Sequence, residues 1–139
     1  MEVTTRYVQI NTQPNGHMHD ITSLIEEELE KIKIKNGIVT IFCIGSTGAI
    51  STVEYEPGLL KDIPAALHRI APENIEYKHH ETWHDDNGKS HVQATILGPS
   101  LTVIISSKKL ILGQWQQIVF IECDTRERKR KIALQFLGN

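Results

Sequence analysis

The sequence predicts an α+β fold, in which a mostly antiparallel β-sheet packs with a few helices in a single domain. Strand-like segments rich in β-branched residues fill the last third of the chain, and residues 20–37 have the apolar spacing of an amphipathic helix. A chain of 139 residues without repeats, low-complexity tracts or a linker has the length of one domain, residues 1–139.

The chain begins with a predicted strand that leads into a helix. Glu2 to Ile10 alternate imperfectly between polar and apolar residues, which predicts a strand, and Asn11 to Asp20 form a polar turn. A helix is predicted from Asp20 to Gly37, because the apolar residues recur at helical spacing and glycine commonly ends a helix. Ser23 and Glu26 have the spacing of a capping box at its start.

Two short strands and a second helix follow. Ile38 to Ile44 predict a buried strand, Gly45 to Gly48 a turn, and Ala49 to Glu56 an alternating strand. Leu59 to Pro72 are helical in pattern. Because proline has no amide proton, Pro64 is expected only near the first turn, which places the start of this helix close to it.

Four of the seven histidines fall between Tyr77 and Ala94, a stretch that is too polar for a core strand. Asp85 to Gly88 predict a turn within it. Ser90 to Gly98 predict a short helix, with Ser90 as its N-cap and Gly98 as its stop. His79 is expected at the end of a strand and His91 at the start of this helix, so the turn between them brings both toward one pocket.

The rest of the chain is predicted to be strands. These strands are Ser100–Ser106, Leu110–Gly113, Trp115–Asp124 and Arg130–Gly138. The last two flank Thr125 to Arg128, which predicts a hairpin.

Composition and charge exclude several classes of protein. The net charge is −2 and the pI is about 6.4, values that do not support nucleic acid or an anionic membrane as a partner of the whole surface. No apolar run reaches the roughly 18 residues of a membrane span, and the N-terminus lacks the pattern of a signal peptide. Cys43 and Cys123 lie in apolar runs without a metal-binding spacing, so buried free thiols and the cytoplasm are expected.

Three separated blocks occur in a fixed order: GSTGAISTVEYEPG from Gly45, NGKSHVQATILGPSLTV from Asn87, and LGQWQQIVFIECDTRER from Leu112. In these blocks the chain resembles the YjbQ-like family, also described as secondary thiamine-phosphate synthase-like proteins. The resemblance covers nearly the whole chain. It implies a compact α+β domain, a homotrimer, and a weak activity that joins a pyrimidine diphosphate to a thiazole phosphate and releases pyrophosphate.

The resemblance also implies which residues form a site. Members carry histidines at the positions of His79 and His91. The chain departs from the family in having His80 where an aspartate is usual, and Lys89 where a subgroup often has histidine. Other positions that match family blocks are Ser46, Thr47, Glu54, Gln116, Glu122, Arg126 and Arg128.

The simplest interpretation of Tyr77 to Ala94 is a polar surface loop. If His79 and His91 form a site, two chemical roles are open to them. They could ligate a divalent metal, zinc or magnesium, together with a carboxylate. Alternatively they could act as acid and base, or contact phosphate, without a metal. Glu54 and Glu122 lie in strands and are predicted catalytic residues if they face the pocket, where they would hold a histidine tautomer or a metal.

Phosphate binding is predicted at two further places. Arg126 and Arg128 are two residues apart, so in an extended segment both face one side and can reach one anion. Ser46 and Thr47 could surround an anion with hydroxyl and amide groups, although turn chemistry alone also explains this segment. Gln116 is a weaker candidate for a substrate contact. The alternative for both arginines is a solvent-facing turn.

We therefore expect a trimeric protein that binds a small phosphorylated ligand and has a thiamine-phosphate synthase type of transferase activity. The alternative is a trimeric protein that binds a metal or a phosphorylated metabolite without turning it over.

Overall fold

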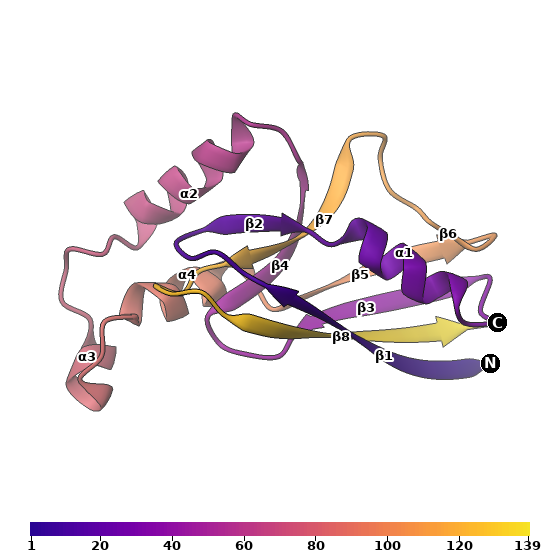
Figure 1. Cartoon of the computed structure of the whole chain (residues 1–139), viewed down its shortest axis with the longest axis horizontal. Helices are drawn as coiled ribbons and strands as arrows, with labels where there is room; N and C mark the ends of the chain where they lie inside the picture. The colour runs from indigo at the N-terminus through magenta and orange to yellow at the C-terminus, as the bar shows by residue number, and fades with distance from the viewer.

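Eight strands form two antiparallel sheets, and four helices pack on or beside them (Figure 1). The computed structural model describes residues 1–139. The five-stranded sheet has the order β1 (Glu2–Asn11), β8 (Lys129–Gly138), β3 (Gly37–Cys43), β5 (Ser100–Ser106) and β6 (Lys109–Leu110). The three-stranded sheet has the order β2 (His17–Asp20), β7 (Gln116–Glu122) and β4 (Gly48–Glu54). The predicted α+β class with antiparallel sheets is confirmed.

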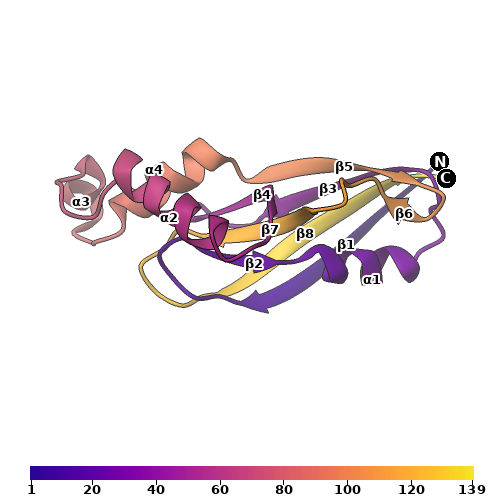
Figure 2. The ribbon, with the colours of Figure 1, turned by 90° about the horizontal axis from the view of Figure 1, so that it is seen from above.

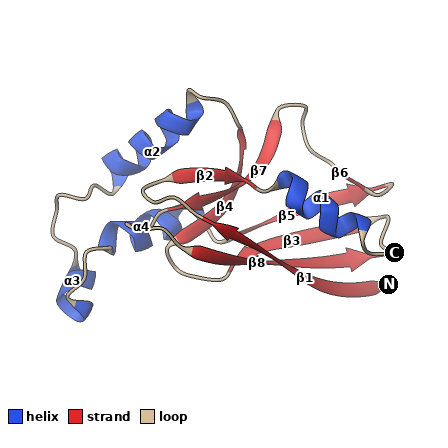
Figure 3. Ribbon diagram, in the orientation of Figure 1, coloured by secondary structure: helices blue, strands red, loops and turns tan.

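The helices divide between the two ends of the molecule. α1 (Thr22–Glu30) lies along one side of the five-stranded sheet, as Figure 2 shows. α2 (Leu59–Ile70), α3 (Lys78–Trp83) and α4 (Gly88–Leu97) gather at the other end (Figure 3). None of the four helices is long and apolar enough to cross a membrane.

β7 is buried on both faces and so contributes to two hydrophobic clusters. Ile118 and Phe120 face the main core, which β3, β5, β8 and α1 also fill. Val119 and Ile121, on the opposite face, pack with Leu67 of α2 and with part of α4. Because side chains alternate along a strand, one apolar run serves both clusters.

The predicted hairpin between the last two long strands is wrong. β7 pairs with β2 and β4, whereas β8 pairs with β1 and β3. The segment between them is therefore a passage from one sheet to the other. Sequence adjacency suggested a local pairing, but both edges of β7 are occupied by β2 and β4, and both edges of β8 by β1 and β3.

α1 ends earlier than its periodicity predicted. The helix stops at Glu30, and the following residues turn so that Ile34 is fully buried in the main core. Gly37 does not end the helix but begins β3. A Cβ on Gly37 would lie 2.0 Å from the Leu137 carbonyl oxygen, so glycine is required for the close approach of β3 to β8. The predicted capping box is also absent, since α1 has no side-chain cap bond.

α2 begins five residues before the proline that was expected to mark its start. It spans Leu59–Ile70 with Pro64 inside it. Pro64 packs against Gly16, in the turn before β2, where a Cβ would lie 3.0 Å from the Pro64 side chain. The strand β2 was not predicted at all, because only Met18 of its four residues is buried and the segment has no apolar pattern.

The histidine stretch is helical rather than extended at its start. His79 lies on α3 instead of at a strand end, and His84 follows α3 with a positive φ of 54°. α4 begins after Asn87, so the prediction of Ser90 as N-cap is wrong. Ser90 lies one turn further in, where its hydroxyl is buried without a hydrogen-bond partner. Gly98 ends α4 as expected.

Candidate functional site

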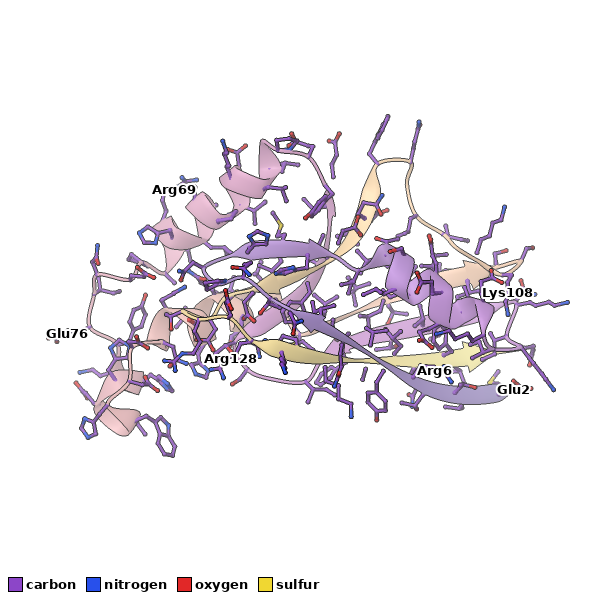
Figure 4. The ribbon with its side chains drawn as sticks, in the orientation of Figure 1. Glu2, Arg6, Arg69, Glu76, Lys108 and Arg128 are labelled. Carbon is purple, nitrogen blue, oxygen red and sulfur yellow. The ribbon has the colours of Figure 1, made fainter.

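Chain segments that are far apart in the sequence meet at the end of the sheets near α3 and α4. They are the segments before β2, between β3 and β4, and between β7 and β8, together with these two helices. Figure 4 shows Arg128 at this end, away from Glu2 and Lys108. Most of the residues predicted as site residues lie here, in a network of charged groups and an adjacent histidine pair.

A buried ion pair forms the base of the network. Glu122 is fully buried, and both of its carboxylate oxygens accept hydrogen bonds from Arg130, at 2.8 and 2.5 Å. Thr12 and the Asp124 amide donate to the same carboxylate, at 2.6 and 3.2 Å. Burial opposes the charge of Arg130, but Glu122 nevertheless raises the arginine's pKa. Each oxygen of Glu122 thus accepts two bonds, which favours a positioning role over the predicted catalytic one.

Thr47 and Asp124 connect this ion pair to the surface. The Thr47 hydroxyl accepts a bond from Arg130 at 2.8 Å and donates to Asp124 at 3.0 Å. Arg128 donates twice to the same Asp124 oxygen, at 3.0 and 2.7 Å. Burial alone would raise the pKa of Asp124, but donation from the Thr125 amide, Arg128 and Thr47 lowers it. Arg128 is therefore held in place while part of its guanidinium remains exposed.

His79 and His91 are brought together as predicted. Their ring centroids lie 4.3 Å apart, with the rings tilted by 48°. The Nε2 atom of His79 lies 3.1 Å from an Asp85 carboxylate oxygen, a contact in which the imidazole donates. Burial, and then the neighbouring His79, lowers the pKa of His91. The pair therefore combines one imidazole bonded to a carboxylate with one whose charged form is disfavoured.

Two other predicted phosphate contacts lie at the edge of this region. Arg126 is mostly exposed, and its guanidinium lies 3.7 Å from Asp86, the neighbour of the carboxylate that holds His79. Ser46 is exposed beside the buried Thr47. Arg126 therefore lies next to the residue beside Asp85, and Arg128 is bonded to Asp124, a charge that acts on His91.

Glu54 and Gln116 do not join the other predicted residues. They pair with each other across β4 and β7, whereas Glu122 pairs with Gly48 at the other end of the same ladder. Six residues of strand separate the two ends, or roughly 20 Å at about 3.3 Å per residue. Within one chain they lie outside the cluster.

The predicted metal site is not complete within one chain. No group of three or more His, Cys, Asp or Glu side chains is arranged to hold a metal ion. If a metal bound here, His79 and His91 would give two of the four ligands that zinc usually takes. The remaining ligands would have to be water or groups from another subunit, and we derive no step through a metal.

Two buried basic residues were not predicted as site residues. Arg130 was predicted only as the first residue of the last strand, and it continues the inward face of β8 that carries Ile132, Leu134 and Phe136. This two-residue alternation was the signal that could have found it. Lys89 is also buried; its ammonium donates to the Asn15 side chain at 3.0 Å and to the Cys123 carbonyl at 2.9 Å. Burial lowers its pKa.

The cysteines contribute no reactive thiol to this region. Cys43 and Cys123 are both free and buried. Burial raises the pKa of the Cys123 thiol to about 12, which disfavours the nucleophilic thiolate.

Comparison with known proteins gives a consistent result over nearly the whole chain. The family model described as UPF0047 protein YjbQ-like matches residues 6–139. A UPF0047 protein of Methanothermobacter thermautotrophicus is 38% identical over 138 residues, which cover 99% of this chain and 94% of that protein. The UPF0047 protein YugU of Bacillus subtilis is 31% identical over 132 residues, covering 94% of this chain and 97% of that protein.

Solved structures show the same fold. A YbjQ-like protein of unknown function from Sulfolobus solfataricus superposes with a TM-score of 0.88 at 33% identity, covering 99% of this chain and 100% of that one. A hypothetical protein from Aeropyrum pernix gives a TM-score of 0.91 at 29% identity, with 98% and 99% covered.

Proposed function

Because this chain belongs to the UPF0047 YjbQ-like family, we propose that it is a transferase of the thiamine-phosphate synthase type. Its substrates would be a hydroxymethylpyrimidine diphosphate and a thiazole phosphate. The observation that carries the proposal is the His79–His91 ring contact beside Arg126 and Arg128 at one end of the sheets.

The reaction needs charge stabilisation at a departing pyrophosphate. The thiazole nitrogen would form a bond to the methylene carbon of the pyrimidine as the bond from that carbon to the diphosphate oxygen breaks. Arg128, anchored by Asp124, and Arg126 would bind the diphosphate oxygens, since guanidinium groups bind phosphate bidentately. His79, oriented by Asp85, and His91 would move protons at the leaving group.

A homotrimer is part of this proposal. The outer face of the five-stranded sheet exposes large apolar side chains, including Tyr7, Phe42 and Ile104 at 51%, 44% and 57%. Tyr7 and Phe42 both pair with Ala133 of β8, so they lie in one row across the sheet. A row of polar residues, Thr5, Gln135, Thr40 and Thr102, separates this row from Ile104. Large apolar side chains exposed on one face of a sheet favour a subunit interface. Light scattering is expected to give three times the mass of one chain; a stable monomer at micromolar concentration would reject it.

The histidine pair provides the test of the activity. Purified protein should form thiamine phosphate and pyrophosphate from the two precursors in the presence of Mg²⁺. Replacing His79 and His91 together by alanine should lower turnover by about 10²–10⁴-fold, the usual contribution of general acid–base catalysis. Product can be quantified after oxidation to its fluorescent derivative, and pyrophosphate by a coupled assay.

An exposed histidine on another helix serves as the control. His68→Ala on α2 should keep wild-type turnover, because His68 is exposed and does not contact the pair. Absence of product from the wild type, or undiminished product in the double variant, would refute the assignment.

The second candidate is a binding protein without turnover. It is favoured by the close approach of two imidazole rings, His79 and His91, because imidazole is a ligand that zinc takes. Metal content of protein purified without a chelator or histidine tag separates the alternatives. Stoichiometric metal that the double variant loses, together with no product, would support binding alone. The compartment we expect for either function is the cytoplasm.

A further inference from the structure

A cavity of about 180 Å³ lies beside the buried lysine of α4. Its walls come from the Asn15–Gly16 turn, from α2, from Glu73 after α2, and from Lys89 and Gln93 of α4. Glycine at position 16 lets this turn pack closely against α2, because a side chain there would crowd Pro64. With its volume of about 180 Å³, the cavity has room for a small anion.

Lys89 is buried with only neutral partners in contact. Its side chain is 3% exposed, and its ammonium is bonded to the Asn15 amide oxygen and the Cys123 carbonyl. No carboxylate forms an ion pair with it within 4.0 Å. An ammonium has three N–H donors, so one is left beyond these two bonds. A buried charge without a counter-ion is costly, which favours an anionic partner.

The neighbouring charges do not supply that partner. Glu122 is bonded to Arg130, and Asp124 to Arg128, so each carboxylate is already matched by a guanidinium. Burial lowers the pKa of Lys89, and Glu73 is the charge that opposes this most, but Glu73 is exposed and forms no ion pair with the ammonium. Lys89 also lies in the first turn of α4, where the helix dipole adds positive potential.

We propose that this cavity binds a small anion, a carboxylate or a phosphate, through the Lys89 ammonium. The anion would accept the remaining N–H of Lys89 and give the buried ammonium a direct counter-ion. Glu73 is the one acidic residue in the wall; it is exposed and weakens the positive potential at the cavity.

This cavity is separate from the site of the proposed transferase activity. Neither His79, His91, Arg126 nor Arg128 lines it. His91 packs on α3, whereas Lys89 and Gln93, four residues apart, form one face of α4 toward the cavity. Anion binding here does not depend on thiamine-phosphate formation, so either proposal can fail without the other.

The test is a titration of the full chain with sodium acetate and, separately, inorganic phosphate. In NMR spectra, the chemical-shift changes of the Asn15, Gly16 and Gln93 backbone amides should saturate with at least one probe. Lys89→Gln should weaken that binding by about tenfold or more, the loss of one hydrogen bond to a charged group. Lys61→Gln, which removes an exposed lysine of α2 that does not line the cavity, should leave the affinity unchanged.

Glu73→Gln is a second variant that tests the same site if Lys89→Gln does not fold. Because Glu73 is exposed, the variant should fold normally and should bind the same anion more tightly. Saturation with acetate alone indicates a carboxylate ligand, and saturation with phosphate alone a phosphate ester. Absence of saturable shifts with both probes, or affinity unchanged by both Lys89→Gln and Glu73→Gln, would overturn the proposal.

Discussion

Replacing Arg130 by alanine is expected to lower the free energy of unfolding by about 3–5 kcal/mol, the usual cost of removing one partner from a buried ion pair. The Glu122 carboxylate would remain fully buried with two of its four hydrogen bonds lost. Thr47 would also lose its donor from Arg130. Urea unfolding followed by circular dichroism, at one fixed protein concentration, measures the loss.

Two further variants show whether the uncompensated charge is the cause. Arg126→Ala removes an arginine that is mostly exposed and should change stability by no more than about 0.5 kcal/mol. Glu122→Leu combined with Arg130→Met removes both charges and should recover much of the stability. A loss below about 1 kcal/mol in Arg130→Ala would mean that water reaches and solvates Glu122.

Gly37→Ala is the second substitution expected to have a large effect. The added Cβ would lie 2.0 Å from the Leu137 carbonyl oxygen and 2.8 Å from the Gly138 Cα. These are backbone atoms that cannot rotate away, and the φ of 155° is one that residues with side chains rarely adopt. Strain and overpacking each cost about 1–3 kcal/mol, so a loss of roughly 2–6 kcal/mol is expected by urea unfolding.

Gly113→Ala is the matched control for this effect. A Cβ at Gly113 would lie 3.6 Å from the Gln116 side chain, an ordinary contact, and should leave stability nearly unchanged. Equal stability of Gly37→Ala and Gly113→Ala would show that β3 can separate from β8 at little cost.

Periodicity alone recovered most of the secondary structure, and its failures have physical causes. β3, β5, β7 and β8 were found because their side chains alternate or fill a core. β2 was missed because a four-residue edge strand buries too little to leave a pattern. The pairing of β7 and β8 was misjudged because strand partners are set by burial across the whole molecule, which no local window contains.

The candidate site was predicted in part, and mostly through its histidines. The contact between His79 and His91 followed from the turn between them and from the family resemblance. The burial of Arg130 and Lys89 was not foreseen, because lysine and arginine are almost always exposed unless paired. Their environment is made by loops from distant parts of the chain, so it exists only after folding.

The double burial of β7 has a consequence for how the molecule comes apart. Its alternate side chains lie in the main core on one face and in the α2–α4 layer on the other. Removing either layer would expose one whole side of the strand to water and leave the remaining layer without a complete partner. The helical end and the large sheet are thus one cooperative folding unit, and β7 is the element through which the loss of one layer destabilises the other.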